Sequence, residues 1–292
     1  MQRNLVNLAL VAAILFVVVA CVCPSQKNQS STQTDPEDKP STTTADKPSD
    51  TTSTTAGKKK DDGDFIAQHD TVSNSRYAEI DKQIKKEKLL ERAADGLNQA
   101  LILPHDISLK SKDCGNVNAF YDPDEQSVTV CYELMEQFFH DFKSNGYDDD
   151  KAYSMMFDAT RFVFLHEIGH ALIDTYKLPI TANEEDAADR CSSFINLEEL
   201  GDDGVKAVLA AAEAFQIESR DSSNHARNMA DEHLLQEQRF YNSLCMLYGS
   251  NPDKYASILD KGFLPKERAV RCPTEYQRTV ESWQSLLQPW RK

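Results

Sequence analysis

The segment from Phe162 to Ile173 constrains the fold more than any other part of the chain, because it is almost entirely apolar. It reads FVFLHEIGHALI, and only His166, Glu167 and His170 in it can ionise. A helix that is apolar all round must be buried all round. Three ionisable groups in such a helix are costly unless they have partners. We therefore expect this helix at the centre of a domain, with polar partners supplied by other elements.

His166, Glu167 and His170 form an HExxH motif. Residues four apart lie on one face of a helix, so both imidazoles can bind one ion while Glu167 stands free beside it. Gly169 costs about 1 kcal/mol relative to Ala in a helix interior, and we expect it to leave open space beside a metal. The alternative is a pair of core histidines that are satisfied by hydrogen bonds.

The next predicted helix, EEDAADRCSSFINLEEL, supplies carboxylates close to the motif. Ile173 and Tyr176 stand where the metzincin pattern requires Gly and His, so that class is excluded. Glu185 and Asp189 are four apart and resemble the ExxxD element of glutamate-ligand zincins. That resemblance implies Glu185 as the third ligand and Asp189 as the partner of a ligand histidine. Glu184 remains an alternative ligand, and acids that only favour the helix N-terminus remain the simpler interpretation.

Three stretches together are similar to a family of bacterial metallopeptidases whose substrates are undefined: HEIGHALIDTYKLPITANEEDAAD, CGNVNAFYDPDEQSVTVCYEL and DEHLLQEQRFYNSLCMLYGSNPDKY. The resemblance spans roughly residues 101–290. It implies a zincin-like domain that binds Zn²⁺ through His166, His170 and Glu185. We expect the α+β class, predominantly helical, with a small antiparallel sheet or hairpin beside the active-site helix.

The expected reaction is peptide-bond hydrolysis by zinc-activated water, with Glu167 as general base and a peptide or protein as substrate. The strand 127–131 is a candidate sheet edge for docking an extended peptide. Candidate donors to the developing oxyanion are His233, Tyr176, Arg239 and Tyr241. One alternative is a catalytically inactive zincin-like lipoprotein that acts as a binding module. Another is a helix bundle without a metal.

The remaining helices follow from apolar spacing and breakers. Pro104 ends the first helix, Asp150 is a candidate cap of the motif helix, and Asn183 is a candidate cap of the next helix, which Gly201 closes. The DPDEQ turn separates two strand-like runs. Expected ranges are a helix over 76–102, a hairpin over 116–132, helices over 133–143 and 150–176, and a mostly helical last third.

The cysteines of the domain predict two disulfides. Cys114 and Cys131 lie symmetrically about the DPDEQ turn, so an even hairpin would place them about 4.5–5.5 Å apart at Cα, within disulfide range. The alternative is a pair of buried thiols. We expect Cys245 and Cys272 to pair because both lie in the C-terminal part of the domain. Cys191 is then left as a buried free thiol.

The N-terminus predicts export and attachment to a membrane. Residues 1–20 read as a signal peptide of the lipoprotein type, cut before Cys21, which would carry lipid. An uncleaved transmembrane anchor is the alternative. Residues 21–64, rich in Ser, Thr and Pro, predict a disordered tether to a metallopeptidase domain over 65–292. The expected location is extracytoplasmic, in a bacterial cell envelope.

The net charge of the chain is −15 at pH 7. Most of this charge belongs to residues 65–292. A surface this acidic argues against nucleic acid or anionic lipid as the main partner.

Overall fold

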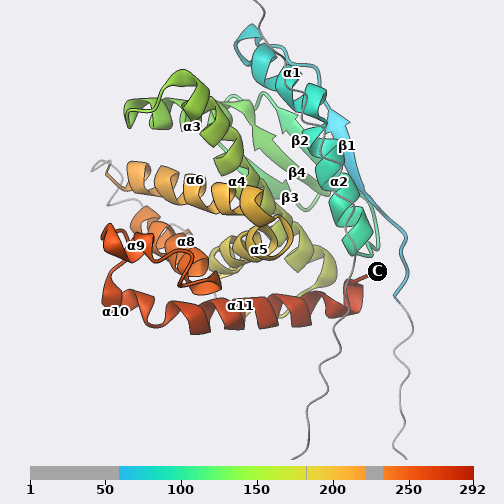
Figure 1. Cartoon of the computed structure of the whole chain (residues 1–292). Coiled ribbons are helices and arrows are strands. Elements are labelled where there is room, and N and C mark those ends of the chain that lie inside the picture. The colour runs from blue at the N-terminus through green and yellow to red at the C-terminus, as the bar shows by residue number, and fades with distance from the viewer. Residues whose placement is uncertain (1–58, 182, 221–232) are drawn as a thin grey trace, which may run out of the picture. The chain divides into compact units, whose positions relative to one another are not determined.

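The computed structural model describes residues 59–181, 183–220 and 233–292 (Figure 1). The predicted signal peptide, the lipidation site Cys21 and most of the predicted tether lie outside these residues. Within the described part of the chain, no helix has the length and apolar character needed to cross a membrane. The α+β class with a predominance of helix is confirmed.

The sheet has four strands in the order β1-β2-β4-β3. Their bounds are β1 (Phe65–His69), β2 (Ile107–Lys112), β3 (Ala119–Asp122) and β4 (Ser127–Cys131). β3 and β4 form the expected antiparallel hairpin, but β1 and β4 both pair parallel to β2. The sheet is therefore mixed, not antiparallel throughout. The expectation that 127–131 forms the edge was wrong, because β4 lies between β2 and β3 and the edge strand of the hairpin is β3.

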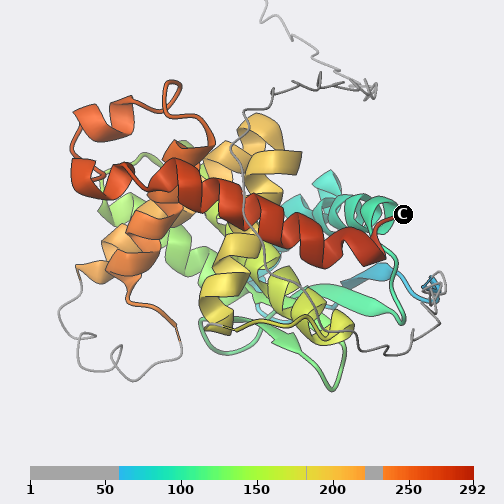
Figure 2. The ribbon, with the colours of Figure 1, turned by 90° about the horizontal axis from the view of Figure 1, so that it is seen from below.

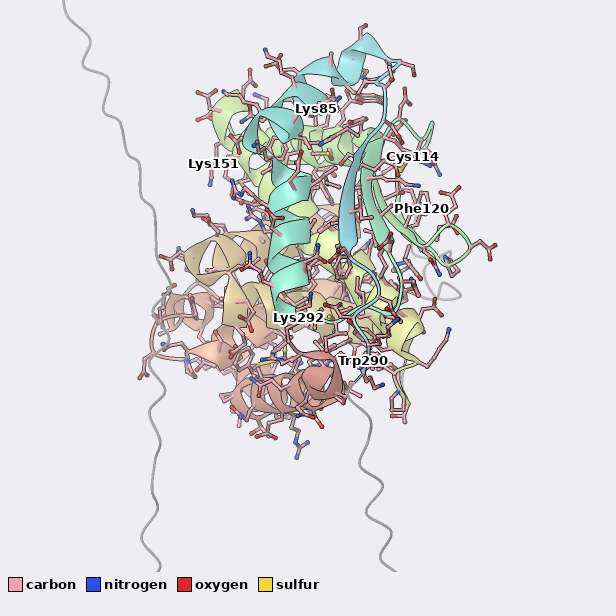
Figure 3. All side chains as sticks on the ribbon, turned by 90° about the vertical axis from the view of Figure 1, so that its right-hand side faces the viewer. Lys85, Cys114, Phe120, Lys151, Trp290 and Lys292 are labelled. Atoms are coloured by element: carbon pink, nitrogen blue, oxygen red, sulfur yellow. A yellow bond between two sulfur atoms is a disulfide. The ribbon has the colours of Figure 1, made fainter. Side chains whose placement is uncertain are left out.

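The helices gather on one face of this sheet, as Figures 2 and 3 show. In Figure 3, Cys114 and Phe120 lie on the strand side, whereas Lys85 and Lys151 lie on the helical side. The registers place the apolar side chains of three strands on a common face, where they are buried. These side chains are Phe65, Ile107, Leu109, Val128 and Val130.

The connection from β1 to β2 is helical but interrupted. It contains a short 3₁₀ turn (Ser75–Tyr77), α1 (Ala78–Glu87) and α2 (Leu89–Ala100), where one helix over 76–102 was expected. Lys88 adopts the left-handed conformation, with φ of 51°, and its N–H caps α1 by donating to the carbonyl of Ile84. A left-handed residue cannot continue a right-handed helix, so the chain changes direction at Lys88.

α4 (Asp149–Tyr176) carries the HExxH motif through the middle of the helical layer. It packs against β3, β4, α3 (Tyr132–Ser144), α5 (Glu184–Glu199) and α6 (Gly201–Ser219). Its N-cap is Asp148, whose side chain accepts from the N–H of Lys151, and not the expected Asp150. Asn183 caps α5 as expected, by accepting from the N–H of Glu185. Gly201 has φ of +55° and begins α6 directly after α5.

The C-terminal helices are α8 (Gln236–Ser250), α9 (Ser257–Asp260), α10 (Lys266–Ala269) and α11 (Cys272–Leu287). The expected disulfide between Cys245 and Cys272 is present and joins α8 to the first residue of α11. After α11 a 3₁₀ turn (Gln288–Trp290) returns to the start of the domain, where the N–H of Ile102 donates to the carbonyl of Trp290 at 2.7 Å. Figure 3 shows Trp290 and Lys292 beside the lower end of α2.

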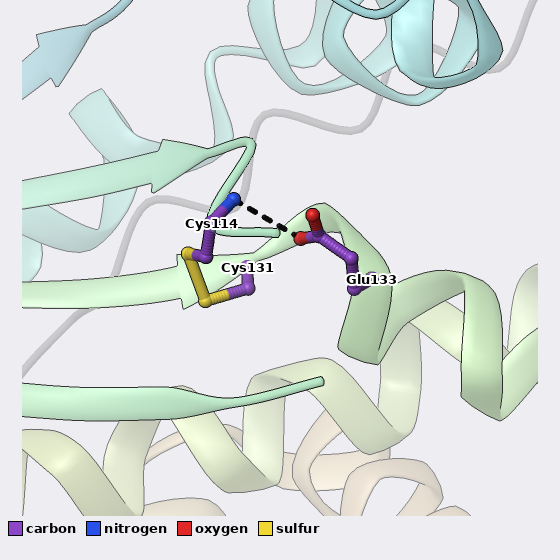
Figure 4. A group of neighbouring side chains, drawn as sticks. All are labelled: Cys114, Cys131 and Glu133. Carbon is purple, nitrogen blue, oxygen red and sulfur yellow. Dashed lines mark hydrogen bonds between the residues drawn. A yellow bond between two sulfur atoms is a disulfide. The ribbon is translucent and has the colours of Figure 1, made fainter. Parts of the chain in front are cut away.

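The expected disulfide between Cys114 and Cys131 is also present, with a Cα separation of 5.5 Å (Figure 4). We expected the two residues to face each other across the β3–β4 hairpin, but they do not. Cys114 follows the end of β2, and the last β2 residue pairs with Cys131 of β4. Glu133, in the first turn of α3, accepts the N–H groups of Cys114 at 3.2 Å and Gly115 at 2.6 Å. Cys191 is free and buried, as expected.

Glu218, near the end of α6, makes the stability of the domain depend on pH. Burial raises its pKa from the ordinary 4.5 to about 7, although the charge of Arg239 opposes this. The folded chain therefore holds a proton that the unfolded chain releases near pH 4.5, so stability falls as pH rises from about 4.5 to 7. Replacing Glu218 by Gln should raise the free energy of unfolding by about 1–3 kcal/mol at pH 8.

The same substitution should change stability little at pH 4, where Glu218 holds its proton in both the folded and the unfolded chain. Urea unfolding at the two pH values measures the difference. Glu267→Gln, at an exposed position on α10, is the matched control and should have little effect at either pH. An equal gain from Glu218→Gln at pH 4 and pH 8 would contradict the assignment of a raised pKa.

Candidate metal centre

The HExxH segment lies in the most buried part of α4. His166 and Glu167 are both buried, and His170 is half-buried. The apolar side chains around them, including Phe162, Ile168 and Leu172, are fully buried. The all-round apolar pattern of this helix is therefore matched by neighbours on all sides, from the sheet and from three helices.

Gly169 lets α5 cross α4 at close range. A Cβ atom at this position would lie 3.0 Å from the Cα of Ala188 and 3.1 Å from the Cβ of Cys191. The expectation that Gly169 leaves open space beside a metal was wrong, because the backbone of α5 fills that space. The close crossing brings the first turn of α5, with Glu184 and Glu185, up to the two histidines.

Replacing Gly169 by Ala should push α5 away by a few tenths of an ångström. Overpacking of about 1–3 kcal/mol should exceed the gain of about 1 kcal/mol in helix propensity. We therefore expect lower stability and a metal affinity reduced about tenfold, measured by thermal unfolding and chelator competition. Gly96→Ala is the matched control, since Gly96 lies in α2 with no atom within 4 Å of an added Cβ, and it should stabilise the protein. Unchanged metal affinity in Gly169→Ala would contradict the packing argument.

The Nε2 atoms of His166 and His170 and the carboxylate of Glu185 converge on one point. The two Nε2 atoms are 3.2 Å apart. The Glu185 oxygens lie 3.1 Å from the Nε2 of His166 and 3.4 Å from the Nε2 of His170. Glu184 instead contacts the opposite ring nitrogen of His170, Nδ1, at 2.8 Å. Of the two acids that the sequence leaves open as third ligand, only Glu185 faces both Nε2 atoms.

Asp189 occupies the remaining ring nitrogen of His166. Its Oδ1 lies 2.8 Å from the Nδ1 of His166, the contact that the resemblance to glutamate-ligand zincins implies for the partner of a ligand histidine. Both histidines thus have a carboxylate on Nδ1, which leaves their Nε2 atoms directed at the same point. Carboxylate partners of this kind fix the orientation of histidines that bind metals.

His233 is the third imidazole at this point. Its Nε2 lies 2.9 Å from Oε2 of Glu185, and its ring stacks on that of His166 at a centroid distance of 6.1 Å. Among the described residues, His166, Glu185 and His233 form a group whose ligand atoms all lie within 4.8 Å of one another. The group of Cys114, Cys131 and Glu133 cannot act in this way, because the two sulfurs form a disulfide.

The other three candidate donors lie elsewhere or are engaged. The hydroxyl of Tyr176 donates to the carbonyl of Ile102, away from the histidines. Arg239 is paired with Asp189, and Tyr241 is exposed on α8. Of the four candidates named from the sequence, His233 alone contacts the candidate ligands directly.

The edge strand β3 meets the site through its backbone. The N–H of Cys131 donates to the carbonyl of Asn118 at 3.1 Å, so in the antiparallel alternation the backbone groups of Ala119 and Tyr121 face away from β4. No described strand pairs with β3 on that side. The backbone of Tyr121 slightly lowers the pKa of Glu167, against the larger rise caused by burial, so this part of β3 lies beside the candidate base. This proximity was missed from the sequence, because only the strand register shows which backbone groups face outward.

Burial and charge act in opposite directions on the pKa values of Glu185, His170 and Glu167. Burial would raise the pKa of Glu185, but hydrogen bonds from His166, His170 and His233 hold it far below the usual range. Burial would lower the pKa of His170, but hydrogen bonds to Glu185 and Glu184 raise it to about 9. Burial raises the pKa of Glu167, although the charges of the two histidines oppose the rise. A metal ion that binds the Nε2 atoms of His166 and His170 would displace the protons that Glu185 stabilises on these atoms.

The donor set fits a divalent metal ion. Two imidazole nitrogens and one carboxylate converge, their outer nitrogens are held by further carboxylates, and a buried acid, Glu167, stands beside them. Three protein ligands with one position left for water are typical of hydrolytic metal centres. The fold and the site thus define a candidate metal-dependent hydrolase.

Comparison with known protein families agrees with this class. The chain belongs to a family described as “Putative metallopeptidase”, whose sequence model matches residues 69–287, more than half of the 292 residues. Membership supports a peptidase that uses a metal ion. The matched range contains the HExxH motif, Glu185 and His233. No curated protein and no solved structure matches the chain.

Proposed function

We propose that the protein is a zinc-dependent peptidase of the zincin type. The observation that carries the proposal is the convergence of the Nε2 atoms of His166 and His170 on the carboxylate of Glu185, with Glu167 next to them. His166, His170 and Glu185 are the proposed ligands. Two imidazoles and a carboxylate are a ligand set that suits Zn²⁺ in hydrolases.

Glu167 is the proposed general base. Zinc, when bound, would lower the pKa of a bound water to about 7 and polarise the scissile carbonyl. Glu167 accepts the proton of the attacking water and then gives it to the leaving amine. Burial raises the pKa of this carboxyl, which makes it a stronger base toward the attacking water than an exposed glutamate would be.

His233 is the proposed donor to the carbonyl oxygen as negative charge develops there. Its ring lies on the Glu185 side of the site, stacked on His166, and 42% of its side chain is exposed. A partly exposed imidazole beside a candidate ligand can reach a substrate, whereas a fully buried one cannot. Hydrogen bonds of this kind to developing charge contribute about 2.7–4 kcal/mol in hydrolases.

The outward-facing backbone of β3 is the proposed docking site for an extended substrate peptide. The backbone of Tyr121 lies near enough to Glu167 to lower its pKa slightly, so a strand laid along this edge would pass beside the base. Main-chain hydrogen bonds along a sheet edge bind peptides with little regard to their side chains.

The proposed location is extracytoplasmic, in a bacterial cell envelope, with lipid on Cys21 and residues 21–64 as a tether. The sequence of the first 20 residues supports export, and the two disulfides agree with an oxidising compartment.

The test is a joint measurement of metal content and cleavage on the full-length chain in detergent. We expect about one zinc per chain and cleavage of members of a peptide library, which a chelator stops and added zinc restores. A chain that binds no zinc overturns the proposal. Cleavage that survives complete removal of the metal overturns it equally.

A further inference from the structure

Arg239 is a buried cation that contacts Asp189, the partner of the candidate ligand His166. It lies on α8, and only 9% of its surface is exposed. Its Nε donates to Oδ2 of Asp189 at 2.8 Å, and its Nη2 donates to Oδ1 at 2.7 Å. This is the paired fork geometry in which a guanidinium fixes both the position and the rotation of a carboxylate.

The same carboxylate oxygen serves both Arg239 and the candidate ligand. Oδ1 of Asp189 lies 2.7 Å from the Nη2 of Arg239 and 2.8 Å from the Nδ1 of His166. A rotation of Asp189 would therefore break its contact with His166. Arg239, Asp189 and His166 form a continuous chain from α8 through α5 to α4.

The guanidinium is itself held firmly. It stacks over the ring of Phe215 in α6, with 4.1 Å between the guanidinium carbon and the ring centroid. Burial alone would raise the pKa of Asp189, but the charge of Arg239 and the contact with His166 lower it below the usual range. Without Arg239, the carboxylate of Asp189, of which only 13% is exposed, would keep only one strong partner, which is costly.

We propose that Arg239 is a positioning residue of the metal centre, which holds Asp189 so that His166 presents its Nε2 to the metal. The inference rests on the proposed function, because it requires that His166 binds zinc. This role makes α8 part of the support of the metal centre. The same helix follows His233 in the chain.

The test is a double-mutant cycle on the zinc affinity of the full-length chain, measured by competition with a chromophoric chelator. Arg239→Gln should weaken zinc binding about 10–100-fold, the range found for outer partners of metal ligands. Asp189→Asn should weaken it similarly. In the Asp189→Asn background, Arg239→Gln should add less than about threefold, because both substitutions break the same chain of contacts.

Two further measurements separate positioning from a general structural role. The absorption spectrum of the cobalt-substituted chain should change in Arg239→Gln, since the geometry of His166 changes. Arg239→Lys should recover only part of the zinc affinity that Arg239→Gln loses. Its ammonium keeps the positive charge, but it cannot make both hydrogen bonds to Asp189. Arg268→Gln is the matched control: it removes a similar two-bond pair, with Glu275 at 2.8 and 2.7 Å, and should leave zinc affinity and spectrum unchanged.

Additive losses in the double variant, or an affinity and spectrum of Arg239→Gln equal to those of Arg268→Gln, would overturn the role of Arg239 alone. Should Arg239→Gln fail to fold, Arg239→Lys is judged by the same cycle. A wild-type chain without zinc overturns the proposed function and this inference together, so the two failures are distinguishable.

Discussion

Replacement of Glu167 by Gln should leave zinc bound and lower peptide cleavage by about 10²–10⁴-fold, the range that general acid–base catalysis contributes. The neutral amide has nearly the same size and shape as the carboxylate, so the surroundings of the histidines should not change. It cannot take a proton from water. Metal content by mass spectrometry and initial rates on one cleaved peptide measure the two halves of the expectation.

Asp158→Asn is the matched control for Glu167→Gln. Asp158 lies on the same helix, α4, and its side chain is only 14% exposed, but it pairs with Arg161 and lies two turns before the histidines. It should keep both zinc and activity. Equal activity of Glu167→Gln and the wild type would sink the mechanism. A wild-type chain that binds zinc but cleaves nothing would favour the inactive binding module.

The part of the site that lies within one helix or between neighbouring helices could be predicted from the sequence. His166, Glu167 and His170 follow from spacing on one helix. Glu185 and Asp189 follow from the next helix, which returns after a short connection. Glu185 could not be separated from Glu184 by spacing, because both lie in the first turn of α5 and only the rotation of that helix decides between them.

Contacts between distant segments were missed or predicted for the wrong reason. The parallel pairing of β1 with β2 joins residues separated by two helices, and no local pattern records it. Cys114 and Cys131 pair as expected, but through the parallel β2–β4 register and not across the hairpin. Arg239 and Asp189 are 50 residues apart, so their contact depends on how α8 packs on α5.

Replacement of Glu185 by Gln should reduce zinc affinity by more than about 100-fold, beyond the range typical of outer partners. The carboxylate faces both Nε2 atoms and only 14% of its side chain is exposed. An amide oxygen carries no charge and is a weaker ligand for Zn²⁺, and the ion would be left with two imidazoles. Activity should be lost with the metal, and excess zinc should restore only part of it.

Glu184→Gln is the comparison that separates the two acids, because it makes the same chemical change one residue earlier. Glu184 contacts only the Nδ1 of His170, and 52% of its side chain is exposed, so solvent can replace much of its effect. We expect a loss of zinc affinity of about tenfold or less, measured by the same chelator competition. The reverse order, with Glu184→Gln the more damaging change, would assign the third ligand to Glu184 and require a different rotation of the first turn of α5.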